Sequence, residues 1–470
     1  MLPFYKKIAY GMGRFGSSFL LSLVGLTAFW IYGTVFELNW FLNGIALGVS
    51  YVIIGLTHWL TGYYSDSVDT RWGRRKPFVM IGAPGLAITG FLVFVPNWFL
   101  DTATYAADPA GNVGLGWIIF GYYLLCICAF KFFYAFLLTA FQAWMPEITT
   151  EDERPLVSSM QNTANWIANG LGVVIGFITP VLFIGATPGL SSLGLMIVLI
   201  FALITVLFYL PSIFLIREKE GIVIPQRSIR EETKTVLRND VYVKWFFVVG
   251  FLSFSFSAIT SQIVGYAQEI LLLTSLETLL PPALALLASI MIFLYIWIKL
   301  VAKVGKGKSM YLSLFVLAIL LCLTPFLGAL IGPLSNVIVA TLYFIPLAAT
   351  MAVYYLMSYI VPADIAHVDE LQTGQSRAGI YEGFKGVPLN MFQAVSAVLL
   401  GWFMDLSEIT TGTTEFGYLW WGPFFAPFLI IAALILRKTN IDPDFEELKQ
   451  FAGATPSDSQ ALDITGTSDN

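Results

Sequence analysis

Two ionisable side chains stand inside long apolar runs of this chain. Lys131 lies in LLCICAFKFFYAFLL and His58 in GVSYVIIGLTHWLTG. A lysine inside a membrane helix usually faces a cavity or a partner, so we expect it either to attract an anionic group of a substrate or to pair with an acid. An imidazole titrates near neutral pH, so His58 could carry a proton or could instead hydrogen-bond a neighbouring helix.

A polar stripe follows further along the chain. Asn162, Asn165 and Asn169 recur at i, i+3 and i+7 beside Trp166, which places them on one helix face. Because such a stripe fits poorly against lipid, we expect it to line a cavity or a helix contact. Weaker candidates for the same cavity are the amides and aromatic side chains of Gln142, Gln262, Gln268, Tyr134 and Tyr355.

Charge gathers in the stretch GYYSDSVDTRWGRRKPF, from 62 to 78. Asp66 could accept hydrogen bonds from the amides that begin a helix, and Arg71, Arg74 and Arg75 could pair with acids. The same bases could also act only as anchors at lipid head groups. This stretch is therefore a candidate gate, with a topology anchor as the alternative.

The elements that position these residues must be membrane helices. The chain has 470 residues, 57% hydrophobic and 12% charged, against about 25% charged in soluble domains. Its mean hydropathy is +0.77. Strand-like alternation is absent, so we predict an all-α membrane protein rather than a barrel. Apolar stretches predict twelve transmembrane helices, near 15–36, 42–64, 77–95, 115–144, 157–183, 191–215, 242–270, 281–302, 309–331, 336–361, 379–404 and 418–436.

Lys and Arg are distributed unevenly between the connections, which predicts the orientation. The connections at 97–114, 184–190, 271–280, 332–335 and 405–417 contain neither residue and are expected outside. Both termini are then cytoplasmic, in a cell (plasma) membrane. A charged linker at 217–240 predicts two six-helix halves, 1–216 and 241–438, followed by a disordered cytoplasmic tail at 439–470.

Three stretches resemble one transporter family. Gly62-x-x-x-Asp66 with Arg71-x-Gly73-Arg74-Arg75 resembles the signature of the major facilitator superfamily, and sucrose transporters have a similar stretch. MPEITTEDERPLVSS (145–159) and ADIAHVDELQTGQSRAGIYEGF (363–384) resemble loops of the glycoside-pentoside-hexuronide:cation symporters, the melibiose-permease-like family. The resemblance implies a major facilitator fold and a symporter that works by alternating access.

The resemblance also places the family's binding positions, and this chain departs from them. The two cation-binding Asp residues of span two correspond to Ile54 and His58, which cannot form the oxygen cage that Na⁺ requires. A proton is therefore a more credible coupling ion than sodium. The family's sugar-binding Asp, Asp, Arg and Lys correspond to Ser18, Leu138, Asn162 and Asn390.

The expected cytoplasmic gate combines the motif bases with acids at other span ends. Its bonds would hold the two halves together when the cavity opens outward. Within it, Glu382 and Lys385 could simply satisfy each other as an i, i+3 pair. The gate comprises Asp66, Arg71, Arg74, Arg75, Glu147, Arg154, Asp364, Asp369, Glu370, Arg377, Glu382 and Lys385.

We therefore expect a secondary transporter for a small organic solute, glycoside-like or anionic, coupled to a proton or a monovalent cation. An uncoupled facilitator and a non-transporting receptor or scaffold remain alternatives. Nothing in the sequence has the spacing of a catalytic, metal or nucleotide site, so we expect no enzyme activity, cofactor or nucleic acid partner. Cys126, Cys128 and Cys322 are expected to pack in apolar runs, and the protein is expected to be a monomer in the lipid bilayer.

Overall fold

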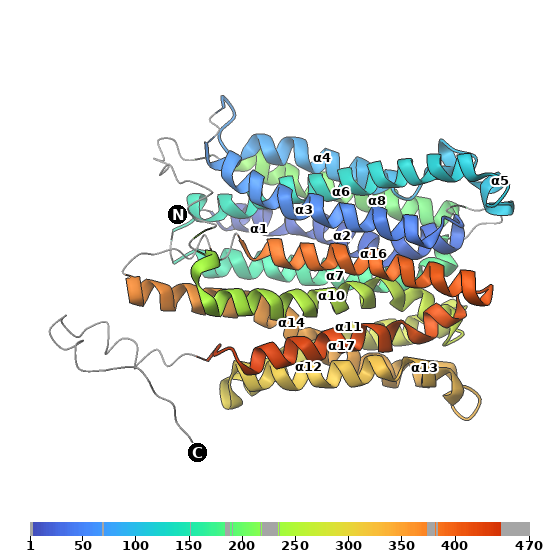
Figure 1. The fold of residues 1–470 in the computed structure, drawn as a ribbon. Coiled ribbons are helices and arrows are strands. Elements are labelled where there is room, and N and C mark those ends of the chain that lie inside the picture. The colour runs from blue at the N-terminus through green and yellow to red at the C-terminus, as the bar shows by residue number, and fades with distance from the viewer. Residues whose placement is uncertain are drawn as a thin grey trace, which may run out of the picture.

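The structure is a computed structural model, and the residues it describes form helices that run side by side along one axis (Figure 1). A helix satisfies its own backbone hydrogen bonds, as a chain in lipid must. Away from the helices, these residues form one isolated bridge, between Ile331 and Leu334. The described residues are 3–67, 70–150, 152–183, 189, 191–216, 218, 234, 236–373, 381 and 384–442.

The first half of the chain forms helices joined mostly by short connections. A π-helical turn, η1, extends the second helix, and α5 lies in the longest outer connection of this half. In chain order the elements are α1 Phe4–Met12, α2 Arg14–Trp30, η1 Ile31–Val35, α3 Trp40–Ser67, α4 Lys76–Leu92, η2 Pro96–Trp98, α5 Thr102–Ala107, α6 Val113–Ile148, α7 Arg154–Phe183 and α8 Ser192–Leu215.

The second half begins with a helix whose first turn is capped. The cap is Asn239, whose side-chain oxygen accepts a hydrogen bond from the Tyr242 amide at 3.0 Å. Such a bond satisfies one of the first amides of the helix, which have no partner within it. The elements that follow are α10 Asp240–Glu269, α11 Leu276–Val304, α12 Lys306–Cys322, α13 Thr324–Leu327, η3 Gly328–Leu330, α14 Asn336–Thr373, α16 Gly386–Thr411 and α17 Glu415–Arg437.

Each of the twelve expected spans coincides at least in part with a helix of the described residues, and the all-α prediction is confirmed. Within the described ranges, ten helices are long and apolar enough to cross a membrane, and Lys306–Leu330 makes an eleventh if its bent parts count as one span. The bend of 48° falls just before Pro325, which cannot donate a backbone hydrogen bond. Since α4 is shorter, at 17 residues, the count of twelve stays a prediction there.

Two helix boundaries differ from the sequence prediction, and each places a charged residue inside a helix that was expected to exclude it. The first candidate span runs from Phe4 to Val35, so it begins well before the expected start at Phe15. Arg14 therefore lies inside the span. At the other end of the chain, α14 continues beyond the expected end at 361 as far as Thr373, so Asp364 is helical. The longer helices are possible because Arg14 hydrogen-bonds Asn165 and Asp364 pairs with Lys306, as described below.

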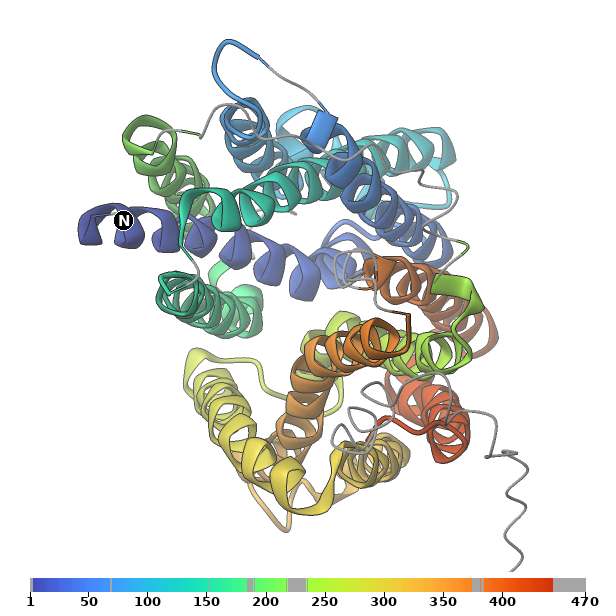
Figure 2. The same ribbon diagram turned by 90° about the vertical axis from the view of Figure 1, so that its left-hand side faces the viewer.

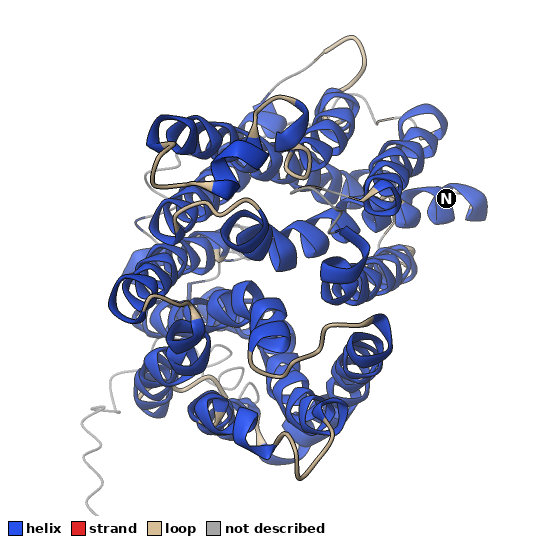
Figure 3. Cartoon of the chain, turned by 90° about the vertical axis from the view of Figure 1, so that its right-hand side faces the viewer, coloured by secondary structure: helices blue, strands red, loops and turns tan. Residues whose placement is uncertain are grey.

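Views along the helix axes show the helices of the first half on one side and most of those of the second half on the other (Figures 2 and 3). Among the described residues, the most extensive contacts between the two sets are those of α3 with α16, α2 with α10, and α7 with α11. Glycine permits the first contact, because a Cβ on Gly44 would stand 2.6 Å from the Ala397 carbonyl oxygen and 2.9 Å from the Cα of Gly401. The residue bounds of the two halves remain predictions.

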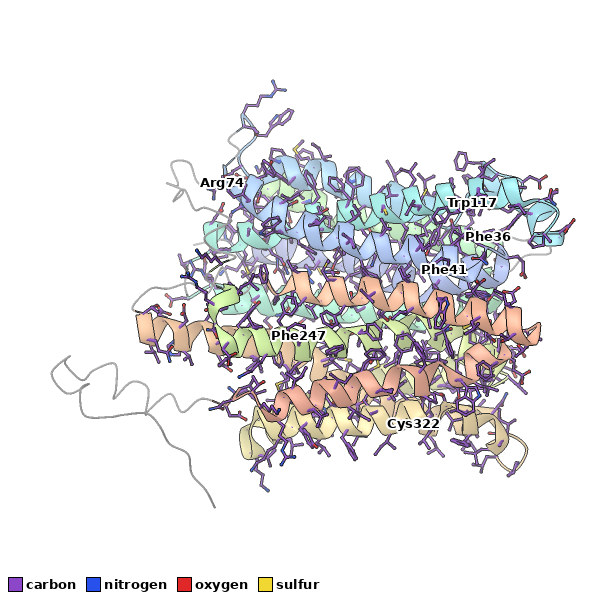
Figure 4. All side chains as sticks on the ribbon, in the orientation of Figure 1. Phe36, Phe41, Arg74, Trp117, Phe247 and Cys322 are labelled. Carbon is purple, nitrogen blue, oxygen red and sulfur yellow. The ribbon has the colours of Figure 1, made fainter. Side chains whose placement is uncertain are left out.

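Side-chain contacts join the two halves at the end of the bundle opposite Arg74, the end near Trp117 (Figure 4). The Asn39 amide donates to Asp405 at 2.5 Å, joining the start of α3 to α16. Trp40 meets Tyr418 edge-on, with ring centroids 6.3 Å apart. Phe177 and Phe344 pack with centroids 5.3 Å apart. Because the predicted orientation places this end outside, we refer to it as the outer end.

Glu37, in the connection before α3, is an exposed carboxylate at this outer end whose pKa is raised. Partial burial, and then the negative charge of Glu408, raise the pKa of Glu37 above its ordinary 4.5. A raised pKa means that the folded state binds the proton more tightly than the unfolded state, so stability falls as pH rises through that window. The penalty is absent below the ordinary pKa and complete above the raised one.

We therefore expect the thermal midpoint of the detergent-purified protein to fall as pH rises across that window, and Glu37→Gln to flatten this dependence. The replacement removes the titrating group while keeping its size. Midpoints recorded at several pH values, at constant ionic strength, make the comparison. An unchanged slope in Glu37→Gln would exclude Glu37 as the cause.

Candidate solute and coupling site

The amide oxygen of Asn165 on α7 collects donors from two helices. Arg14 Nη2 donates to it at 3.0 Å and Ser18 Oγ at 2.6 Å, both from α2. Asn169 Nδ2 adds a third bond at 3.1 Å. Since a carbonyl oxygen offers two lone pairs, three donors saturate it. Asn165, Asn169 and Ser18, which the sequence singled out separately, thus meet in one hydrogen-bonded group.

Arg14 is the functional candidate that sequence reasoning missed. Its side chain is only 8% exposed, and its Nε has no hydrogen-bond partner among the described residues. The expected start of the first span at Phe15 leaves it outside the membrane. A signal was present, because Arg14 precedes Ser18 by four residues, the spacing that puts two side chains on one helix face.

His58 on α3 faces α6. Its Nδ1 lies 2.7 Å from the hydroxyl of Thr139, and its ring meets Tyr134 edge-on at 6.3 Å. Thr139 lies two residues before Phe141 on α6. Phe141 packs against Gly13, the neighbour of Arg14, so His58 and Arg14 lie at the same level of α6. Both roles expected for His58 stay open, since a helix-bridging hydrogen bond and an exchangeable proton are compatible. We call Arg14, Ser18, His58 and Asn165 the polar cluster.

Lys131 lies in the middle of α6, about 25 Å along the helix from either end at 1.5 Å per residue. Its side chain is 3% exposed, and its Nζ stands 4.7 Å from the centroid of the Tyr51 ring on α3. Such a cation–π contact is worth roughly 0.5–2 kcal/mol. Leu138, seven residues further on, is also buried and lies on the same helix face.

Acids are absent from the middle stretches of the expected spans, and the acids of Glu269 and Glu382 lie close to the ends of theirs. The sequence has no Asp or Glu from 3 to 36, 38 to 65, 77 to 100, 109 to 146 or 154 to 217. In the second half, 241–268, 278–363, 383–404 and 416–441 also lack acids. Arg14 and Lys131 are therefore buried cations for which the spans supply no counter-charge. Among the described residues no acid forms an ion pair with Lys131, and the alternative in which Lys131 pairs with a cavity acid stays a prediction.

The second half faces this region with uncharged groups. Gln262 on α10 is 1% exposed, and its Nε2 has no partner among the described residues, as is also true of the Ser261 hydroxyl. Tyr355 on α14 meets Trp166 on α7 edge-on at 5.4 Å, which joins the two halves at mid-height. Gln268, further along α10 than Gln262, is half-buried.

Other expected cavity residues lie apart from the polar cluster. Asn162 and Gln142 are exposed, and Asn162 approaches only Ser158, at 3.5 Å, among the side chains described. Asn390 donates to the carbonyl of Gly386 in its own helix at 2.7 Å. Its Cβ packs where α16 crosses Gly55, next to the buried Ile54. Asn390 therefore lies at a helix crossing with Gly55, the residue that follows Ile54.

The bases of the 62–78 stretch bind acids at the inner end. Arg74 and Arg75 both form ion pairs with Glu147 at the end of α6, and the Arg75 pair measures 3.1 Å between Nη2 and Oε1. Arg75 also donates to Ser65. We call Arg74, Arg75 and Glu147 the inner ion-pair cluster. It joins the loop after α3 to α6, within one half of the bundle.

Glu218, a residue the sequence did not single out, caps the start of α4. Its carboxylate accepts from the backbone amides of Arg74, Arg75 at 2.9 Å and Lys76 at 2.6 Å. A negative charge there is favourable because the first amides of a helix lack partners and carry its positive end. This is the part expected of Asp66, whose side chain lies outside the described residues.

The remaining gate candidates are dispersed. Lys306 pairs with Asp364 at 2.6 Å, within the second half, so Asp364 does not serve Arg71, Arg74 or Arg75 in this conformation. Arg71 is exposed and lies over the Trp72 ring at 4.4 Å. Asp369 is buried, Glu370, Arg154 and Lys385 are half-buried, and Arg377 and Glu382 lie outside the described residues. A gate between the halves stays a prediction.

Solved transporter structures share this fold. The nucleoside transporter NupG superposes with a TM-score of 0.62 at 13% identity, over 93% of this chain and 100% of that one. A D-xylose-proton symporter gives 0.60 at 14% identity, over 93% and 98%. A bacterial homologue of the human lysosomal transporter Spinster gives 0.61 at 12% identity, over 96% and 98%. At these identities the likeness concerns the fold.

Sequence relatives cover shorter stretches. An uncharacterised symporter of Synechocystis sp. is 26% identical over 161 residues, which is 34% of this chain and 28% of that protein. The uncharacterised symporter YnaJ of Bacillus subtilis is 24% identical over 191 residues, 40% of this chain and 38% of that one. The matches thus span less than half of either relative. The sequence model of the MFS/sugar transport protein family, by contrast, matches residues 9–436, and the chain is a transporter belonging to that family.

Proposed function

We propose that this protein is a secondary transporter that moves a small organic solute bearing a negative charge by alternating access, coupled to a proton. The observation that carries the proposal is Lys131, buried at the middle of α6 against Tyr51, in a helix with no acid from 113 to 146. A cation is expensive at that depth, and a solute anion would offset the cost while it is bound. The relatives named symporters support coupling to an ion.

The contacts between the halves support an inward-facing conformation. They run from Asn39 and Asp405 at the outer end to Gly55 and Asn390 on the inner side of the bundle centre. Asn162 and Gln142, nearer the inner end, are exposed. We propose that a solute reaches the polar cluster from the cytoplasm in this state, and that separation of Asn39 from Asp405 opens the outer path.

Coupling to a proton is assigned to His58. It occupies a position where the resembling symporters have a cation-binding acid, it is linked to Thr139, and Ile54 beside it offers no oxygen. An imidazole binds a proton without an oxygen cage, whereas Na⁺ needs several oxygen ligands. An uncoupled facilitator is the second candidate, favoured by the same lack of carboxylates.

Replacing His58 tests the coupling directly. In proteoliposomes with an imposed pH gradient, we expect His58→Ala to abolish accumulation of the solute above equilibrium while exchange of internal for external solute continues. Exchange needs the alternating movement but no net proton transfer. Na⁺ gradients of equal size provide the comparison. Full accumulation by His58→Ala would assign coupling elsewhere, and wild-type uptake indifferent to both gradients would favour the facilitator.

A further inference from the structure

We propose that Arg14, held by Asn165, is an oxyanion-binding group for the solute, separate from Lys131 and nearer the cytoplasmic end. This proposal extends the proposed function. It rests on that function because the bound oxyanion is taken to be part of the transported solute. The site is built from two helices, with Arg14 and Ser18 on α2 and Asn165 on α7. Its ligand class is a carboxylate, sulfonate or phosphate.

The guanidinium has donor capacity to spare. One nitrogen, Nη2, donates to Asn165 at 3.0 Å, while the buried Nε has no acceptor in the part of the chain that the structure describes. A buried donor left without a partner costs about 1–3 kcal/mol. Arginine presents its N–H groups as a planar fork that matches two oxygens of an oxyanion. The unpaired edge of Arg14 therefore has the geometry for a group with paired oxygens.

The charge balance points the same way. The first span has no Asp or Glu from 3 to 36, and α7 has none from Arg154 to Phe183. Asn165, the residue that holds Arg14, is an amide and neutralises no charge. A buried cation without an anion costs several kcal/mol. An anion that comes from outside the chain would remove this cost whenever it is bound.

Snorkelling does not account for this placement. Arg14 lies about 15 Å along the helix from Phe4, at 1.5 Å per residue, and its side chain is 8% exposed. Lys7, two turns nearer that end, already meets Glu153 at 2.9 Å. The guanidinium is thus turned to Asn165 inside the bundle, whereas Lys7 binds the acid at the inner end.

Arg14 and Lys131 stand at different depths. His58 hydrogen-bonds Thr139 at the level where α6 packs against Gly13, beside Arg14. His58 also lies seven residues from Tyr51, the partner of Lys131, so the two levels are separated by about 10 Å along α3. One small oxyanion can contact only one of the two cations at a time. Lys131 and Arg14 could therefore bind the same anionic group one after the other along the transport path. During release to the cytoplasm, Arg14 would bind it second.

The test is ligand-dependent thermal stabilisation of the purified full-length protein. The probes are sodium D-glucuronate and sodium acetate, compared with D-glucose and sodium chloride at equal ionic strength. We expect both oxyanions, and neither control, to raise the wild-type midpoint saturably, because binding to the folded state stabilises it. Arg14→Gln should raise the half-saturating oxyanion concentration at least tenfold, and Arg14→Lys, which keeps the charge but loses the fork, should fall between.

A second variant guards against misfolding of Arg14→Gln. Asn165→Asp places a carboxylate beside the guanidinium, which should satisfy Arg14 internally and abolish the oxyanion response while the protein stays folded. Lys299→Gln, which removes an exposed lysine that lies over Tyr295 on α11, should respond as wild type does. Wild type without an oxyanion response, or a full response in Arg14→Gln and Asn165→Asp, would overturn the assignment.

The same data separate this site from the wider proposal. If the oxyanion response depends on Arg14 but no probe is ever transported, the transport proposal fails and the binding site stands. If transport depends on Lys131 and is indifferent to Arg14→Gln, with wild-type half-saturation, the Arg14 site fails alone.

Discussion

Glu147→Ala should destabilise the protein strongly. The carboxylate neutralises two arginines, and Arg75 is 4% exposed, so its loss leaves buried positive charge without this counter-charge. Breaking a buried pair in this way costs about 3–5 kcal/mol. We expect a clearly lower thermal unfolding midpoint in detergent, and faster loss of monodisperse protein on heating.

A matched control is available in the same chain. Lys244 and Asp240 form an exposed i, i+4 pair on α10, at 2.5 Å, with Asp240 75% exposed. Such pairs contribute about 0–1 kcal/mol, so Asp240→Asn should leave the midpoint almost unchanged. Equal midpoints for Glu147→Ala and Asp240→Asn would show that the inner ion-pair cluster is not a stabilising element.

Lys131→Gln should reduce uptake of the anionic solute more than tenfold. The replacement keeps much of the side-chain volume but removes the charge that stands against Tyr51, and tenfold corresponds to about 1.4 kcal/mol of binding free energy. The expected change is a higher KM, with the thermal midpoint equal to or above that of wild type because a buried unpaired charge has gone. Initial uptake rates in proteoliposomes over a range of solute concentrations measure it.

Lys299→Gln is again the comparison, since its ammonium lies 4.4 Å from the centroid of the Tyr295 ring but is exposed. We expect its uptake to match wild type. Lys131→Arg should retain part of the affinity, because the charge remains while the shape changes. Wild-type KM in Lys131→Gln would remove Lys131 from the solute path.

The helices could be predicted from the sequence because an apolar chain in a membrane must satisfy its own backbone hydrogen bonds. Runs such as 191–215 leave only a helix as a way to satisfy the backbone, and α8 occupies Ser192–Leu215. Boundaries are less predictable where charge enters the helix. By its charge alone Arg14 should end the apolar run, but its bond to Asn165, far along the chain, allows the span to begin at Phe4.

Contacts between distant segments account for most of what the sequence leaves open. The pairing of Arg74 and Arg75 with Glu147 is predictable in kind, since opposite charges share the inner end. The sequence does not predict that Glu218 caps α4, because the linker has several acids and their spacing does not distinguish Glu218 from the others. Likewise, the meeting of Ser18 with Asn165 depends on how α2 packs on α7, which no local pattern records.

The most direct test of an alternating-access transporter that selects anionic solutes is paired uptake into proteoliposomes. Each pair differs only by a carboxylate, as D-glucuronate and D-glucose do, and each is measured under an imposed pH gradient with wild type and Lys131→Gln. The account predicts that wild type accumulates at least one anionic member over its neutral counterpart, and that Lys131→Gln loses this preference. Equal uptake of both members by both proteins would contradict it.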